Sequence, residues 1–370
     1  MKEHTPAITD IDAVVASLSP GEARLFHRIF RTSTAVGRLR PPQDMVPWIE
    51  AHMGAVSEVE EQHIVKVTNM VTFEGTLYNG LRARRPIEAQ GCEAPDDSRL
   101  SHCGPGDPLQ HPRATTPEDI FGRVEGRHCL TASNVAKYDG LHGMVVFNEH
   151  NPLTLSRDRI VDYIDTGWKW AERAHRTDPQ ARYFLFIWNC LWRAGASLIH
   201  GHAQVMLGRD IHYAKVEGLR RAAAGYRAQY GSRYFDDLYH VHASLGLGME
   251  RDGVRVLAYL APLKDNEVML MAPSLDLAFK ERLYEVLDFL CRRWGVSSFN
   301  LALVTPPLGE GDEGWEGFPV LARIVDRGDL QVVASDMGAM ELYAASVVAS
   351  DPFPLARLLT QSLGDGPAHR

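Results

Sequence analysis

The stretch Arg193-Ala-Gly-Ala-Ser-Leu-Ile-His-Gly-His-Ala-Gln204 is the most informative part of this chain. Side chains alternate between the two faces of a β-strand, so His200, His202 and Gln204 are predicted to share one face. The intervening glycine and alanine leave the other face free to pack closely. The small residues upstream form a flexible turn that brings backbone N–H groups and the Ser197 hydroxyl to an anion. This combination suits a phosphate, because imidazole attacks phosphorus and neutral donors hold its oxygens.

The segments around this stretch predict an α+β fold with antiparallel sheets and packed helices. Ser156 is expected to begin a helix whose apolar residues lie on one face. A similar order of strands and helix returns later, which indicates two half-repeats from a degenerate internal duplication. The predicted strands are 144–147, 183–188 and 197–207 in the first half and 256–260, 267–271, 300–304 and 320–324 in the second, with a second-half helix at 275–294.

Three regions follow from this pattern. Residues 1–62 are predicted to be an N-terminal helical extension, a packing or dimer arm without catalytic groups. Residues 63–245 form the catalytic half, and residues 246–370 form the second, degenerate half. Residues 88–127 are rich in Gly, Pro, Asp and His, which indicates a long loop that is either functional or held by a metal.

Composition excludes several classes of protein. The chain has 370 residues, 45% of them hydrophobic and 23% charged, as in ordinary soluble globular proteins. Its net charge of -8 argues against a nucleic-acid partner, which requires a basic face. The five cysteines are irregularly spaced and predict no disulfide framework. With neither a signal peptide nor a membrane span in the sequence, we expect a cytoplasmic protein.

With 16 histidines in the chain, a His-x-His alone would be unremarkable, but its neighbours are specific. The chain resembles the histidine-triad superfamily, most closely its galactose-1-phosphate uridylyltransferase branch, over roughly residues 65–350. The resemblance implies a fold of two triad-like half-repeats and, usually, a homodimer. The matching positions are Arg82-Ala-Arg-Arg-Pro86, Asn134, His150, Asn189, Gly195, Ser197, His200, His202 and Gln204.

The resemblance also implies roles for these residues. His202 would be the nucleophile that takes a nucleoside monophosphate from a nucleotide sugar, and Ser197 and Gln204 would bind the phosphate oxygens. The other nucleotide-binding residues would be Arg82, Arg85, Asn134, Asn189 and Gly195. No organic cofactor is expected.

The identity of residue 204 distinguishes hydrolysis from nucleotidyl transfer. Hydrolases of the superfamily have a third histidine at this position, which protonates a poor leaving group. Glutamine cannot do so, and it suits a leaving group that is already a stable anion, such as a sugar phosphate. The leading hypothesis is therefore nucleotidyl transfer between a nucleotide sugar and a sugar 1-phosphate through nucleotidyl-His202. The alternatives are a nucleotide-sugar or dinucleoside-polyphosphate phosphorylase, with phosphate as the acceptor, and a non-catalytic nucleotide-binding protein.

The chain departs from the family at its metal sites. The family's zinc site combines a Cys-x-x-Cys pair with two histidines, equivalent here to His150 and His200. This sequence has no Cys-x-x-Cys, and Cys103 is the candidate third ligand of a structural zinc. The alternative is a loop held by hydrogen bonds. Residues 315–324 contain no histidine, so a second metal site is not expected, and the alternating pair His240 and His242 is a weaker metal candidate.

Overall fold

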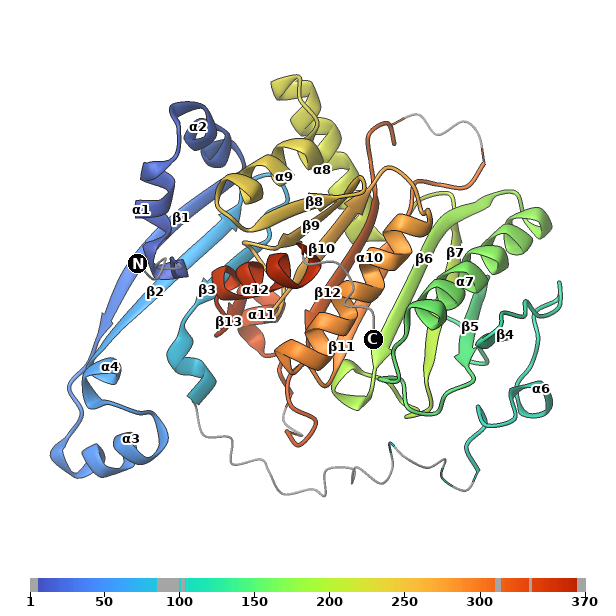
Figure 1. Ribbon diagram of the computed structural model, residues 1–370, viewed down its shortest axis with the longest axis horizontal. Helices are drawn as coiled ribbons and strands as arrows, with labels where there is room; N and C mark the ends of the chain where they lie inside the picture. The colour runs from blue at the N-terminus through green and yellow to red at the C-terminus, as the bar shows by residue number, and fades with distance from the viewer. Residues whose placement is uncertain are drawn as a thin grey trace.

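The computed structural model describes residues 6–84, 100, 104, 106–309, 314–332 and 335–364. A nine-stranded sheet forms the centre of the protein, with strand order β4-β5-β7-β6-β11-β12-β10-β9-β8 (Figure 1). All of its strand pairs are antiparallel. A smaller sheet has the order β1-β2-β3-β13, in which β13 runs parallel to β3.

The central sheet contains the predicted internal duplication. In each half the chain runs strand, strand, helix, strand, strand, and the last two strands exchange places in the sheet, giving β4-β5-β7-β6 and β9-β10-β12-β11. The halves meet where β6 pairs with β11. The first half comprises β4 (Cys129–Ser133), β5 (His142–Phe147), α7 (Arg157–Thr177), β6 (Ala181–Cys190) and β7 (His202–Arg209). The second comprises β9 (Val254–Ala258), β10 (Val268–Ala272), α10 (Leu277–Asp288), β11 (Phe299–Val304) and β12 (Val320–Asp326).

Shorter elements connect and extend the two halves. Between β6 and β7 lies η4 (Trp192–Ala194), and between β7 and β9 lie α8 (Ala214–Tyr230), α9 (Tyr234–Ser244) and β8 (Gly248–Arg251). Before β4 the chain forms η1 (Ile8–Asp10), α1 (Ile11–Ser17), α2 (Pro20–Ile29), β1 (Phe30–Arg38), η2 (Gln43–Met45), α3 (Val46–His52), α4 (Val56–Glu60), β2 (Glu61–Asn69), β3 (Gly75–Tyr78), η3 (Gly80–Arg84) and α6 (Pro112–Thr115). The π-helical turn η5 (Phe289–Trp294) continues α10, and α11 (Ala339–Tyr343), β13 (Ser346–Val348) and α12 (Pro352–Gly364) follow β12.

Helices α7 and α10 lie side by side on one face of the central sheet (Figure 1). Ser156 caps α7, as the sequence predicts, by accepting a hydrogen bond from the backbone N–H of Arg159. At Gly167 a Cβ atom would lie 3.2 Å from side-chain atoms of both Phe186 and Val205, so glycine lets α7 approach β6 and β7 closely. This face is the hydrophobic core, which leaves the other face of β6 and β7 for the site.

The N-terminal region differs from its prediction, because it is not helical throughout. Besides α1 and α2 it contains the nine-residue strand β1, which pairs antiparallel with β2 along its whole length. The predicted boundary between residues 62 and 63 therefore falls inside β2. Most of β1 is exposed, so its sequence lacks the apolar alternation that predicts a strand.

The Tyr239–Ala243 stretch also differs, because it lies in the helix α9 rather than in a strand. Residues two apart in a helix point in different directions, so His240 and His242 do not form a metal-binding pair. His242 is fully buried, donates from Nδ1 to the carbonyl oxygen of Leu238 and accepts at Nε2 from the backbone N–H of Leu260. None of the described helices has both the length and the apolar character needed to cross a membrane.

Candidate active site

His202 and Gln204 lie at the start of β7, on the face of the sheet opposite α7. Ala203 and Val205 are turned toward the core and are buried. In the antiparallel register Gln204 lies opposite Ile187 of β6. The alternation predicted from the sequence therefore holds for His202 and Gln204.

The imidazole of His202 has a defined orientation. Its Nδ1 lies 2.8 Å from the carbonyl oxygen of His200, which can only accept, so Nδ1 donates the proton. In the neutral ring Nε2 then carries the lone pair. The side chain is almost completely buried, with 8% of the residue exposed, and this burial lowers the pKa of His202. The ring is thus held neutral with one nucleophilic nitrogen.

His200 does not share the strand face as predicted, because it precedes β7 in a turn. Its Nε2 donates to the carbonyl oxygen of Phe147 at 3.0 Å, and its Nδ1 lies 2.9 Å from Oδ2 of Asp107. Nδ1 of His150 lies 3.4 Å from Nδ1 of His200 and 3.5 Å from Oδ2 of Asp107. Asp107, His150 and His200 thus form a cluster whose ligand atoms all lie within 4.8 Å of one another.

The chemistry of this cluster fits a cation. Nδ1 of His200 lies within hydrogen-bond distance of the Asp107 carboxylate, so either a proton on Nδ1 or a cation between the two groups holds this pair together. Metal-bound histidines commonly donate their second N–H to a backbone carbonyl, as His200 does to Phe147. Two imidazole nitrogens and one carboxylate oxygen also form a common ligand set for zinc. Asp107 was not predicted, and Cys103 lies outside the described residues.

Gln204 contacts His142, which no sequence motif indicated. Oε1 of Gln204 lies 2.9 Å from Nε2 of His142 in the neighbouring strand β5. Nδ1 of His142 accepts a hydrogen bond of 2.9 Å from the backbone N–H of Tyr138, whose ring stacks on the imidazole. His142 is completely buried, and this desolvation lowers its pKa. Gln204 is only partly buried, so its amide reaches the open side of the sheet.

The predicted phosphate-binding turn precedes these residues. Gly195 ends η4 in the left-handed region with φ of 88°, a conformation that favours glycine. Ser197 is exposed, and its hydroxyl has no hydrogen-bond partner within the described part of the chain. Its side chain is therefore available to a ligand. The turn leads through the buried His200 directly into His202.

The remaining predicted residues fall into three groups. Asn134 follows β4, and its Nδ2 lies 3.2 Å from Nε2 of His142, so it is close to Gln204. Arg82 is an exposed residue of η3, and its neighbour Ala83 lines a pocket of about 400 Å³ together with Arg193 of η4. Arg85 lies outside the described residues.

Asn189 begins a polar chain that the sequence did not reveal. Its Oδ1 accepts a hydrogen bond of 2.7 Å from Nδ2 of Asn300 in β11. Oδ1 of Asn300 accepts from Arg327, and Arg327 forms two bonds of 3.0 and 2.7 Å with the carboxylate of Asp336. Lys264 lies 3.6 Å from the same carboxylate. The predicted residue Asn189 is thus fixed from the second half of the protein.

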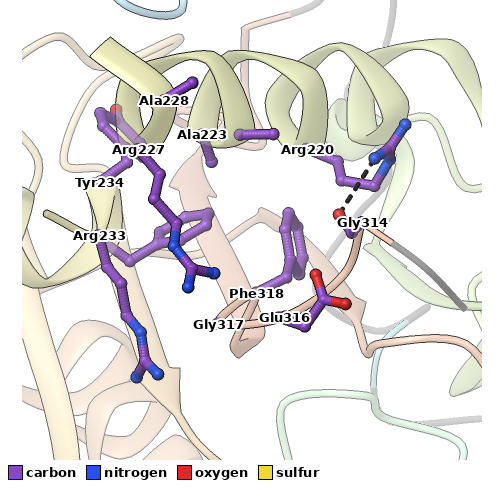
Figure 2. A pocket seen from close by; sticks show the side chains of 12 residues that line it. Arg220, Ala223, Arg227, Ala228, Arg233, Tyr234, Gly314, Glu316, Gly317 and Phe318 are labelled. Carbon is purple, nitrogen blue, oxygen red and sulfur yellow. Dashed lines mark hydrogen bonds between the residues drawn. The ribbon is translucent and has the colours of Figure 1, made fainter. Parts of the chain in front are cut away.

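Two described pockets flank α8. One, of about 280 Å³, begins at Asn189 and continues over the apolar side chains of β6, β11 and β12. The other, of about 340 Å³, lies between α8 and the segment 314–318 (Figure 2). Arg220 donates to the carbonyl oxygen of Gly314 at its edge, Arg227 extends into it, and Arg233 is one of its lining residues. None of the predicted site residues lines this second pocket, so it is separate from the His202 site.

Solved structures share this architecture. No protein-family model matches the chain, and neither does any curated protein sequence. ADP-glucose phosphorylase from Arabidopsis thaliana, with bound ADP-glucose, matches 78% of this chain and 95% of its own with a TM-score of 0.58 at 16% identity. A uridylyltransferase matches 82% of this chain and 99% of its own with a TM-score of 0.53 at 16% identity. A galt-like protein from Arabidopsis thaliana matches 68% and 90%, with a TM-score of 0.54 at 15% identity.

The chain has the fold of these proteins. The predicted α+β class, with two half-repeats of the same topology in one antiparallel sheet, is therefore confirmed. At these identities the likeness establishes the fold alone.

Proposed function

We propose that this protein is a nucleotidyltransferase that moves a nucleoside monophosphate between a nucleotide sugar and a phosphate acceptor through a covalent bond to His202. One observation carries the proposal: the Nδ1–H of His202 is committed to the carbonyl oxygen of His200, and the nucleophilic Nε2 lies on the same strand face as the amide of Gln204. An oriented imidazole beside neutral hydrogen-bond donors is the arrangement required for attack on phosphorus.

The reaction is balanced without a net proton transfer in either step. Nε2 of His202 forms a bond to the α-phosphorus, and the bond from this phosphorus to the bridging oxygen breaks. The electron pair leaves with that oxygen, so the sugar phosphate departs as an anion. The imidazole gains positive charge as the N–P bond forms, which strengthens the Nδ1–H bond to the carbonyl oxygen of His200. An oxygen of the acceptor phosphate then attacks the phosphorus and restores the lone pair of His202.

The neighbouring groups have supporting roles in this proposal. Ser197 and Gln204 donate to the phosphate oxygens, and Asn189 holds the ribose or the phosphate. The amide of Gln204 cannot act as a general acid, so it cannot protonate a leaving group. This favours transfer to a phosphate acceptor over hydrolysis.

The acceptor is either a sugar 1-phosphate or inorganic phosphate. The leading assignment is the sugar 1-phosphate, and the likeness of the fold to a uridylyltransferase supports a transferase. Phosphorolysis is the second candidate, and the ADP-glucose phosphorylase neighbour favours it. The two are separated by adding each acceptor to the covalent intermediate, since inorganic phosphate releases a nucleoside diphosphate and a sugar 1-phosphate releases a nucleotide sugar.

We also propose that Asp107, His150 and His200 hold a structural zinc ion. Zinc would supply a positive charge to which two imidazole nitrogens and one carboxylate oxygen can bind. It would also fix the backbone of His200, whose carbonyl oxygen orients His202. The ion takes no part in the transfer step itself.

Intact-mass measurement after mixing the protein with a panel of nucleotide sugars tests the transfer proposal. The expected result is a mass gain of one nucleoside monophosphate, which is lost in His202→Asn and retained in His240→Asn. His240 is an exposed histidine of α9, so its variant controls for the chemical change. An adduct that persists in His202→Asn would show that the nucleophile is another residue. No adduct with any nucleotide sugar would favour a binding protein.

A further inference from the structure

His142 is a buried polar residue with no part in the proposed transfer reaction. Its exposed fraction is 0%, and it begins β5, the strand that pairs with β7. It contacts two of the predicted site residues, Asn134 and Gln204, and Gln204 is 62 positions away in the sequence. A buried imidazole requires partners for both ring nitrogens, and these partners determine which nitrogen carries the proton.

The contacts of His142 define its tautomer. A backbone N–H can only donate, so Nδ1, which receives the N–H of Tyr138 at 2.9 Å, carries the lone pair. Nε2 of the neutral ring then carries the proton and donates to Oε1 of Gln204 at 2.9 Å. Nδ2 of Asn134 also lies 3.2 Å from Nε2, but a protonated nitrogen cannot accept from it. We therefore assign the shorter contact as the hydrogen bond.

This bond distinguishes the two ends of the Gln204 amide. With Oε1 occupied by His142, the NH₂ group is the end that remains for a ligand, and it has no hydrogen-bond partner within the described residues. The opposite orientation would turn the amide oxygen toward the substrate. An oxygen with lone pairs repels a phosphate oxygen, whereas an N–H group binds it.

We propose that His142 is a positioning residue that holds the Gln204 amide with its nitrogen toward the substrate phosphate. The proposal rests on the proposed function, because it requires Gln204 to bind that phosphate. On this proposal, the site prefers a phosphate ligand because His142 of β5 determines which end of the Gln204 amide on β7 faces that ligand. His142 itself touches neither the substrate nor the reacting atoms.

A double-mutant cycle tests this role. His142→Phe removes the donor and retains a planar ring, and it should lower kcat/KM by about tenfold, as expected for the loss of one oriented hydrogen bond. In a Gln204→Ala background the same change should alter kcat/KM by less than about twofold, because the amide to be oriented is gone. His142→Gln places an NH₂ group near the position of Nε2 and should recover most of the activity.

His242→Phe is the matched control. His242 is equally buried and uses both ring nitrogens, but it lies in α9 against Phe30 and Tyr259. Any effect of its substitution should be the same in the native and Gln204→Ala backgrounds. Equal losses for His142→Phe in both backgrounds would overturn the proposal, because they would assign His142 a purely structural role.

Nitrogen-15 NMR of the histidine-labelled native protein provides a test that needs no stable variant. His142 should be observed as the Nε2–H tautomer and His202 as the Nδ1–H tautomer. An Nδ1–H tautomer at His142 would overturn the proposal. Failure of the proposed function is distinguishable, because it removes the nucleotide adduct on His202, whereas an additive cycle with the adduct intact refutes only the role of His142.

Discussion

Gly201 separates the two histidines of the site, and Gly201→Ala should disable transfer while leaving most of the protein's stability intact. A Cβ atom at this position would lie 2.6 Å from Cδ2 of Phe147 and 2.8 Å from the backbone oxygen of Glu149. Carbon atoms prefer a separation of about 3.5–4.0 Å, so the strand must move by about 1 Å. Backbone atoms cannot rotate away as a flexible side chain does.

The magnitude follows from the position of this residue. The backbone N–H of Gly201 donates to the carbonyl oxygen of His150 at 2.8 Å, and the carbonyl oxygen of Gly201 accepts from the backbone N–H of Phe147 at 2.9 Å. Any shift of Gly201 therefore also moves the adjacent His202. Overpacking of this kind costs about 1–3 kcal/mol of stability. Misplacement of a reacting group by about 1 Å lowers the rate by about 100-fold. The loss of activity should therefore greatly exceed the loss of folded protein.

The assay combines adduct formation, followed by intact mass over time, with urea unfolding. We expect adduct formation to slow by about 100-fold, with a lower midpoint of unfolding and an unchanged m-value. Gly218→Ala is the matched control, because no atom lies within 4 Å of a Cβ at this position in α8, and it should stabilise the protein by about 0.5–1 kcal/mol. Gly201→Ala with a native rate of adduct formation would refute the argument that this contact positions His202.

Two further predictions concern the metal cluster and the buried histidines. Asp107→Asn should lower the zinc content of purified protein, measured by elemental analysis, because a neutral amide is a poorer ligand than a carboxylate; an unchanged zinc content would refute the assigned ligand set. Burial lowers the pKa of both His212 and His242 to about 4. Below pH ~6.5 the unfolded chain therefore binds more protons than the folded protein does, and the free energy of unfolding decreases as the pH is lowered. At pH 5 each of these histidines should lower the free energy of unfolding by about 2 kcal/mol. Urea unfolding measures this loss, which should be smaller in His242→Phe. Equal stability at pH 7 and pH 5 would contradict the prediction.

Local pattern predicted the parts of the fold in which one face of an element is buried. The apolar face of α7 and its Ser156 cap are visible in the sequence, as is the alternation of His202 and Gln204. Strand β1 was not predicted, because most of its residues are exposed and its sequence therefore lacks alternating apolar residues. His200 was assigned to the strand, but its contacts with Asp107 and Phe147 hold it in a turn.

The sequence by itself determined the nucleophile candidate, the amide two positions after it and the order of the two half-repeats, because spacing along one chain segment sets which side chains share a strand face. Only the tertiary structure revealed Asp107 and His142, which contact His200 and Gln204 across 93 and 62 residues of chain. Asp107 lies in an irregular segment and His142 on a different strand, so neither has a fixed spacing to the motif. Their placement depends on how the strands pair in the folded sheet, which no local period encodes.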